Sequence, residues 1–404
     1  MKGGCILKFI IFLVYQWIMT KQSIVSIVRV NNDIEVAVRK AVDLIGGMPS
    51  IISRGQVVLI KPNFIREEPS YMGTTTNIGV IKATIKLVKE AGAVPIVGEA
   101  SGNQYDTEYI YENLGIREEL EGVKILDLDR DEIVSVKIKG AKALKEVGVA
   151  KSVLEADFII GLPLLKTHMT TMVTIGMKNM MGVLPQREKW KMHMSGLHQA
   201  LVDLNRIAKP GLVIVDGITG MEGLGPTIGS PVQMNLILAG KDVVAVDTVG
   251  AAVMGFSLEE VKHLTLAGND GLGVNRLDEI EIRGENIESV TRPFKRPHGG
   301  AFFLVWGVLQ YRIGTFLLNR FDYDIRPFLK SFSNIYVAKP MVKKELCDGC
   351  AECATVCKKQ ALKMKKGYPS IDYSLCTKCL RCFRVCSKGG IAFSRKPVWM
   401  IKYF

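Results

Sequence analysis

Short apolar runs alternate with longer amphipathic stretches from Ser23 to about Val290. Each short run has the length and composition of a β-strand: Val57–Ile60, Val94–Val97, Val123–Asp127, Asp157–Pro163 and Leu212–Gly217. Residues Val80–Ala91 follow a helical period instead, and Gly92 marks the helix end. This alternation predicts an α/β domain over residues 23–295, with a mostly parallel sheet flanked by helices in Rossmann-like layers.

Polar side chains stand at the ends of the predicted strands. In open α/β sheets, ligands bind at the carboxyl ends of the strands. We therefore expect a substrate-binding role for Lys61, Asn63, Glu99 and Asp216. The two carboxylates also suit a base or a metal ligand, although solvated turn positions explain them equally well.

Two lysines and a histidine are candidates for catalysis. Lys166, His168 and Lys178 follow glycines and strand ends, near several threonine hydroxyls. Such a mixture of donors suits a carboxylate or a phosphate, and a histidine titrates near neutral pH. The plain alternative is that the lysines are solvated and the histidine is structural.

Two further apolar segments fall outside this pattern. Residues Ile6–Ile18 are interrupted by Lys8 and are short for a membrane span. Translation from Met19 would omit most of segment 1–22, and a membrane-associating segment is the alternative. Residues Ala301–Leu318, within a linker over 296–340, predict a core or interdomain helix, with an interfacial membrane helix as the alternative.

The positive charge of the chain is concentrated at its C-terminus. The 404 residues carry a net charge of +13. From Met341 onward there are 14 Lys and Arg against 4 Asp and Glu, whereas the preceding residues hold 39 against 36. A basic face attracts acidic proteins, anionic membrane surfaces or nucleic acid, or it offsets negative charge held nearby. We expect no nucleic-acid partner because no recognition motif accompanies the charge, and contact with a membrane surface is not favoured.

Eight of the nine cysteines lie in one block, which we assign to a module over residues 341–404. A dense block on a cysteine-poor body predicts a reducing, cytoplasmic setting and not a disulfide framework. The spacing is Cys347-x2-Cys350-x2-Cys353-x3-Cys357, followed by Cys376-x2-Cys379-x2-Cys382-x3-Cys386. Paired zinc ions would not require this doubled three-residue rhythm.

This spacing resembles that of the bacterial-type two-cluster ferredoxins and predicts two [4Fe–4S] clusters. The fourth cysteine of each run ligates the other cluster in such modules. The first set is therefore Cys347, Cys350, Cys353 and Cys386. The second set is Cys357, Cys376, Cys379 and Cys382.

The α/β body carries a second resemblance. Its motifs are Lys61-Pro62-Asn63, Gly161-x-Pro163-x2-Lys166-Thr167-His168, Gly176-Met-Lys178-Asn179 and Asp216-Gly217 with Gly223-x-Gly225-Pro226. Together they resemble the family known as domain of unknown function 362, which is often fused to a ferredoxin module. The resemblance spans about residues 55–275 and implies an architecture without implying a reaction.

These features favour an iron–sulfur oxidoreductase. In this interpretation a low-potential carrier of ferredoxin or flavodoxin type delivers electrons, and the α/β body holds an anionic small molecule. One alternative is an electron-transfer, docking or assembly protein without catalysis of its own. Another is a non-redox enzyme whose clusters are structural, so the sequence leaves open whether the chain is an enzyme.

Overall fold

The computed structural model describes residues 23–102, 106–227, 229–297, 339–357 and 359–394. The apolar segments Ile6–Ile18 and Ala301–Leu318 lie outside these ranges, so the expectations for them stay predictions. Within the described ranges, no helix combines the length and the apolar character that a membrane crossing requires.

A ten-stranded sheet forms the centre of the α/β body, and its main path has the order β12-β1-β11-β10-β7-β2-β3-β4. These strands are β1 (Ser23–Arg29), β2 (Val57–Lys61), β3 (Val94–Glu99), β4 (Lys124–Asp127), β7 (Phe158–Gly161), β10 (Leu212–Glu222), β11 (Ser230–Gly240) and β12 (Ile280–Gly284). Parallel pairing joins β10, β7, β2, β3 and β4, and also β1 to β12. The predicted mostly parallel sheet is confirmed.

On the main path of the sheet, one strand departs from the parallel arrangement. β11 is antiparallel to both of its neighbours, β10 and β1. Only a few residues connect β10 to β11, and so short a connection can join antiparallel strands but not parallel ones.

Shorter strands extend this frame. β8 (Leu164–His168) runs parallel to β10 and antiparallel to β9 (Met172–Thr174). A separate hairpin joins β5 (Ile133–Lys137) to β6 (Glu146–Ala150). β8 therefore carries two of the candidate residues, Lys166 and His168, alongside the far end of β10.

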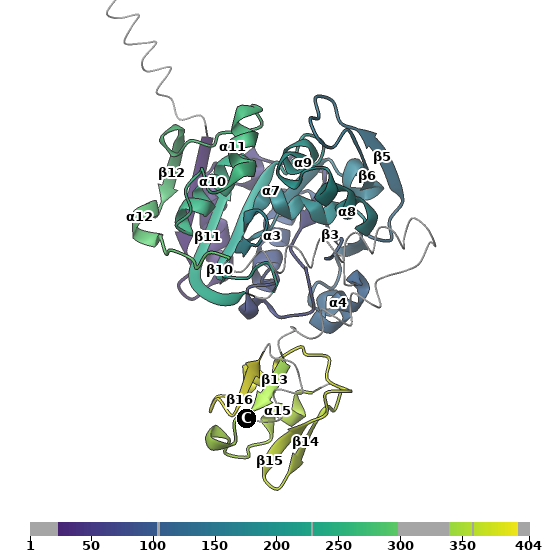
Figure 1. The fold of residues 1–404 in the computed structure, drawn as a ribbon, viewed down its shortest axis with the longest axis vertical. Helices are drawn as coiled ribbons and strands as arrows, with labels where there is room; N and C mark the ends of the chain where they lie inside the picture. The colour runs from purple at the N-terminus through teal and green to yellow at the C-terminus, as the bar shows by residue number, and fades with distance from the viewer. Residues whose placement is uncertain (1–22, 103–105, 228, 298–338, 358, 395–404) are drawn as a thin grey trace, which may run out of the picture.

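Helices connect the strands and cover the sheet (Figure 1). The α-helices of the body are α2 (Ile34–Asp43), α3 (Ile78–Glu90), α4 (Thr107–Leu114), α5 (Ile116–Glu119), α6 (Lys151–Glu155), α7 (Gly176–Asn179), α8 (Gln186–Met194), α9 (Leu197–Leu204), α10 (Val243–Val253), α11 (Lys262–Asn269) and α12 (Ile287–Val290). The 3-10 turns are η1 (Met48–Ser50), η2 (Ser70–Met72), η3 (Met180–Val183) and η4 (Leu277–Glu279). Asp33, Asn77 and Asp106 each accept a backbone N–H at a helix start, which fixes where α2, α3 and α4 begin.

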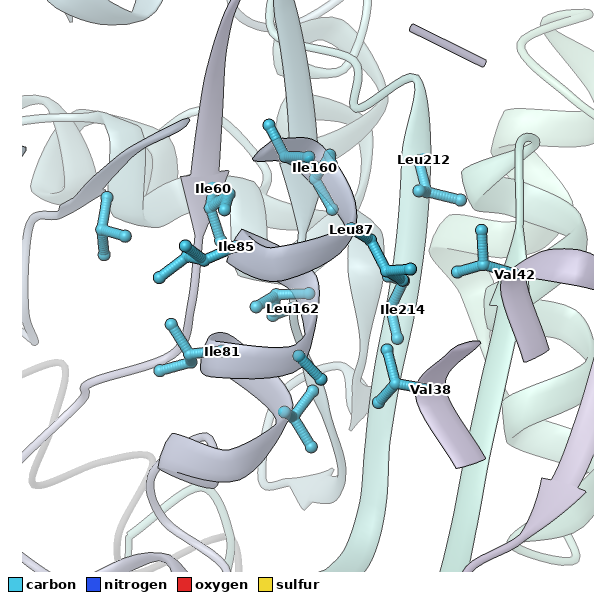
Figure 2. Close-up of a cluster of buried hydrophobic side chains, with 14 of the residues drawn as sticks. Val38, Val42, Ile60, Ile81, Ile85, Leu87, Ile160, Leu162, Leu212 and Ile214 are labelled. Carbon is cyan, nitrogen blue, oxygen red and sulfur yellow. The ribbon is translucent and has the colours of Figure 1, made fainter. Parts of the chain in front are cut away.

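The core lies on both faces of the sheet. On one face, α2 and α3 present Val38, Val42, Ile81, Ile85 and Leu87 to strand residues that include Ile60, Ile160 and Ile214 (Figure 2). Val213 and Val215 of β10 point the other way and pack with α10. Side chains alternate along a strand, so a strand covered on both faces reads as a continuous apolar run. That is the pattern from which the strands were predicted.

The described part of the cysteine-rich module consists of four short strands and three short helical elements. Its strands are β13 (Lys339–Val342), β14 (Leu362–Lys365), β15 (Tyr368–Ile371) and β16 (Ile391–Ser394), and its helical turns are η5 (Lys344–Leu346), α15 (Glu352–Thr355) and α16 (Arg381–Val385). β13 pairs with β16 and β14 with β15, both antiparallel. The module lies beside the end of the body that carries α4 (Figure 1).

Candidate functional site

A pocket of about 230 Å³ opens at the carboxyl ends of β2 and β3. The lining comes from the strand ends, from β8 and β9, and from α7, η3 and α8. It includes Lys61, Asn63, Glu99, Ser101, His168, Thr174, Lys178, Asn179, Lys189 and His193. The structure thus brings most of the predicted site residues together, where the topology of an open α/β sheet places a ligand.

A buried ion pair forms the floor of this pocket. The Lys61 Nζ lies 2.8 Å from the Glu99 Oε2, and both side chains are buried. Glu99 also accepts the backbone N–H of Phe64 over 3.0 Å. Burial lowers the pKa of Lys61 and raises that of Glu99, and each charge partly offsets the shift of the other. These two residues hold β2 and β3 in place beneath the pocket.

An amide network extends from this pair. Asn179 on α7 accepts from Asn63 Nδ2 over 2.9 Å and donates to the Lys61 backbone oxygen over 3.1 Å. Asn63 Oδ1 in turn accepts the Lys166 Nζ over 2.7 Å. Lys166 also donates to the Thr74 backbone oxygen over 3.1 Å. Both acceptors of Lys166 are neutral, and burial lowers its pKa to about 7.

Three donors that line the pocket have no oxygen partner among the described residues. The Lys178 Nζ lies 2.9 Å from the thioether sulfur of Met181, which is a weak acceptor. The Thr174 and Ser101 hydroxyls are buried and make no hydrogen bond within the part of the chain that the structure describes. Burial, reinforced by the charge of Lys189, lowers the pKa of Lys178 to about 7. Buried hydroxyls of this kind are normally satisfied by a ligand or by water.

His168 is held as a neutral ring. Its Nδ1 accepts the backbone N–H of Thr170 over 3.1 Å, which assigns the proton to Nε2. Burial, followed by the charge of Lys178, lowers its pKa well below the usual value. His168 therefore offers the pocket a hydrogen-bond donor more readily than a general base.

Asp216 lies outside the pocket lining. Its carboxylate accepts the backbone N–H of Asn77 over 2.7 Å and that of Ile218 over 3.1 Å. The strand expected to end at Gly217 continues to Glu222, so Asp216 is not at a strand end. Burial raises its pKa to about 6.

Lys189 is a pocket residue that the sequence analysis did not select. It comes from α8, and its Nζ donates to the backbone oxygens of Ala100 and Ser101 over 2.7 and 2.6 Å. The polar sequence of α8, QREKWKMHM, is equally typical of a solvated helix, so the pattern carried no signal for this residue.

The eight described cysteines are free of disulfides and gather in two groups of four. One hollow is lined by Cys347, Cys350, Cys353 and Cys386, and another by Cys357, Cys376, Cys379 and Cys382. These groups are the first and second sets defined by the spacing. Among the described residues, no group of three or more His, Cys, Asp or Glu side chains could hold a metal ion as placed. The fit to a cluster therefore rests on the donor set and on the backbone around it.

The backbone around the sulfurs suits bound thiolates. Amide N–H groups point at the sulfurs of Cys357, Cys376 and Cys386 over 3.2 to 3.4 Å. Ala351, Lys378 and Leu380, each next to a cysteine, have positive φ angles of 55 to 63°. Left-handed backbone at these positions turns the chain sharply beside the cysteines. The donor set and the backbone around it are compatible with iron–sulfur binding.

The second set faces the α/β body. Its hollow, of about 200 Å³, is also lined by Glu112, Asn113 and Glu118 of α4 and α5. The hollow of the first set is lined by residues of the module alone among those described, and Cys350 is exposed. The two sets therefore differ in position: the second lies at the contact with the body and the first at the outer side.

Comparison with known proteins supports the resemblance of the body. A family model described as "Domain of unknown function (DUF362)" matches residues 58–252. The thylakoid-associated protein sll1697 of Synechocystis sp. is 29% identical over 251 residues, covering 59% of this chain and 75% of that protein. The family match ends before the cysteine-rich module, whose resemblance to ferredoxins remains a prediction.

Among solved structures, the lactate racemase apoprotein from Thermoanaerobacterium thermosaccharolyticum matches with a TM-score of 0.35 and 11% identity. The match covers 55% of this chain and 54% of that one, so the chain spans about half the length of the racemase. A likeness of this size carries no functional argument.

Proposed function

We propose that this chain is an iron–sulfur redox protein that holds two [4Fe–4S] clusters and binds an anionic substrate or cofactor on its α/β body. The observation that carries the proposal is the separation of eight free cysteines into two groups of four, one of them facing the body. Bound clusters would supply one-electron transfer at low potential.

The pocket supports an anionic ligand. Lys178, Thr174 and Ser101 line it without oxygen partners among the described residues, and the neutral His168 adds a donor. A carboxylate or a phosphate accepts several such hydrogen bonds at once. Lys178 would neutralise its charge, and the two hydroxyls would orient it. We retain Lys178 and His168 as the groups nearest to the chemistry, with Lys166 as a support behind them.

Electron delivery is proposed to occur at the first set, because Cys350 is exposed there and the second set faces the body. The partner would be a soluble low-potential carrier. Free cysteines also favour a reducing compartment such as the cytoplasm.

A docking or electron-transfer protein without its own catalysis is the second candidate. The observation in its favour is that Lys61, Lys166 and Lys189 all have their ammonium groups hydrogen-bonded within the protein. If the remaining donors only bind water, the body would serve as a recognition surface.

Anaerobic purification with iron and sulfide analysis tests the cluster assignment. About eight irons and eight sulfides per chain, with the EPR signals of two reduced cubes, are expected. Stoichiometric zinc without such signals would overturn it.

Calorimetric titration with sulfate tests the pocket. Sulfate is expected to bind to the wild type, and Lys178→Ala should abolish this binding. Lys86 is an exposed lysine on α3, and Lys86→Ala should leave the binding unchanged. A loaded protein that binds no small anion would favour the docking role.

A further inference from the structure

A closed loop runs from the pocket to the cysteine-rich module. It begins at Asn63, just after the end of β2, and closes at Thr76, and we call residues 63–76 the bridging loop. Asn63 donates its N–H to the Thr76 Oγ1 over 2.8 Å, and Thr76 donates its N–H to the Asn63 oxygen over 2.9 Å. Phe64 and Thr75 pair as an antiparallel bridge just beyond. The two ends of the loop are thus fixed to each other.

Lys166 is hydrogen-bonded to both ends of the bridging loop. Its Nζ donates to the Asn63 Oδ1 near the start of the loop and to the Thr74 backbone oxygen near its end. Lys166 is fully buried, so these two bonds satisfy a charge that has no access to water. A change in the position of this ammonium group therefore acts on both sides of the loop.

The bridging loop also forms part of the pocket. Ile65 lies in the lining, and the Arg66 Nη1 donates to the backbone oxygen of Thr227, another lining residue, over 3.0 Å. A ligand in the pocket would therefore contact this loop directly.

The tip of the loop docks on the second cysteine set. The Tyr71 hydroxyl donates to the Leu380 backbone oxygen over 2.8 Å, and its ring lies 5.8 Å from that of Phe383. Met72 and Leu380 are both buried in the apolar contact beneath. Leu380 stands between Cys379 and Cys382, so the contact is made by the backbone that positions two sulfurs.

The loop has little freedom between its two ends. Gly73 has a φ of 69°, and a Cβ at this position would lie 2.3 Å from the backbone oxygen of Gly220. Phe64 is buried against the Tyr111 ring at 5.9 Å. A packed element of this kind transmits a displacement from one end to the other instead of absorbing it.

We propose that the bridging loop couples ligand binding in the pocket to the second cysteine set, with Lys166 and Tyr71 as its positioning residues. The inference rests on the proposed function for the identity of the metal group and of the ligand. Coupling is reciprocal, so a ligand that shifts the potential of the second set is itself bound differently after reduction.

The direction follows from charge. Reduction adds a negative charge, so a bound anion is expected to lower the midpoint potential of the second set, and reduction to weaken anion binding. A tenfold change in affinity corresponds to 59 mV for one electron. The first set, which has no described contact with the loop, should shift less.

The test is an EPR redox titration of the loaded protein with and without sulfate. In wild type, sulfate should shift one of the two potentials. Tyr71→Phe removes the hydroxyl that reaches Leu380 and should reduce this sulfate-dependent shift to the part that acts through space. The matched control is Tyr373→Phe, which removes a phenol-to-carbonyl bond of 2.7 Å to Pro340 within the module and should retain the shift. An equal shift in wild type and Tyr71→Phe would overturn the coupling, because a direct electrostatic effect needs no loop.

Amide hydrogen exchange on the same samples separates this inference from the proposed function. Lys166→Met should accelerate exchange in residues 376–383, a segment of the other module, whether or not sulfate binds. Asn63→Leu should do the same by removing the other half of that bond. Unchanged exchange in both variants would overturn the coupling, whereas low iron content with accelerated exchange would overturn the cluster assignment alone.

Discussion

Lys61 and Glu99, 38 residues apart in the chain, meet as an ion pair of 2.8 Å beneath the pocket with both side chains out of solvent. The pair links the ends of two neighbouring parallel strands. Each charge depends on the other, because neither has access to water.

Removing either partner should therefore be costly. Lys61→Met or Glu99→Gln is expected to lower the free energy of unfolding by about 3–5 kcal/mol, because an unpaired charge stays buried. The double variant should recover more than half of that loss. Urea denaturation measures all three, with the exposed Lys82–Glu119 pair of 2.7 Å as the control. Replacing Lys82 should cost less than about 1 kcal/mol, and an equally small effect at Lys61 would contradict this account.

Anion binding should weaken as the pH rises. The pKa values of Lys166 and Lys178 are lowered to about 7 by burial, so both groups are largely charged below pH 7 and lose their protons above it. A bound anion favours the charged form, so binding takes up protons. Sulfate affinity, measured by calorimetry, should fall about tenfold between pH 6 and pH 8 for each lysine that must be charged. Affinity that rises with pH would exclude a lysine-based site.

Replacing the fourth cysteine of either run should remove the cluster held by the other three cysteines of its set. Cys386→Ser is expected to remove the cluster of Cys347, Cys350 and Cys353, and Cys357→Ser the cluster of the second set. Iron content should fall from about eight to about four in each case. The two variants should lose different EPR signals, and loss of the same signal in both would show that the assignment to sets is wrong.

A methyl group at Gly73 should damage the bridging loop. Gly73→Ala adds strain at a positive φ and places a Cβ against the Gly220 oxygen. Gly122→Ala has the same strain, at a φ of 77°, but meets no atom within 4 Å. We expect Gly73→Ala to be less stable than Gly122→Ala by about 1–3 kcal/mol in urea denaturation, the usual cost of overpacking. Equal losses of stability in the two variants would mean that the loop accommodates the added methyl group.

The sequence predicted the strands and the edge of the sheet where Lys61, Asn63 and Lys166 meet, because strands buried on both faces are visible as apolar runs. It missed the antiparallel course of β11, which depends on a short connection and not on periodicity. Asp216 was misplaced for a related reason: its strand continues to Glu222, and two backbone amides bind the carboxylate. The contact of Tyr71 with Leu380 depends on how two modules dock, and neither residue carries a local signal for it.

The position of β1 has a consequence for how the chain is made. Val25 pairs with Gly240 on one side and with Ile282 on the other, so the first described strand lies inside the sheet, between two of its last. During synthesis β1 cannot pair until β11 and β12, more than two hundred residues downstream, have been made. Contacts of such long range form slowly. The sheet of the body is therefore completed only when nearly all of the body has been synthesised, shortly before the cysteine-rich module is made.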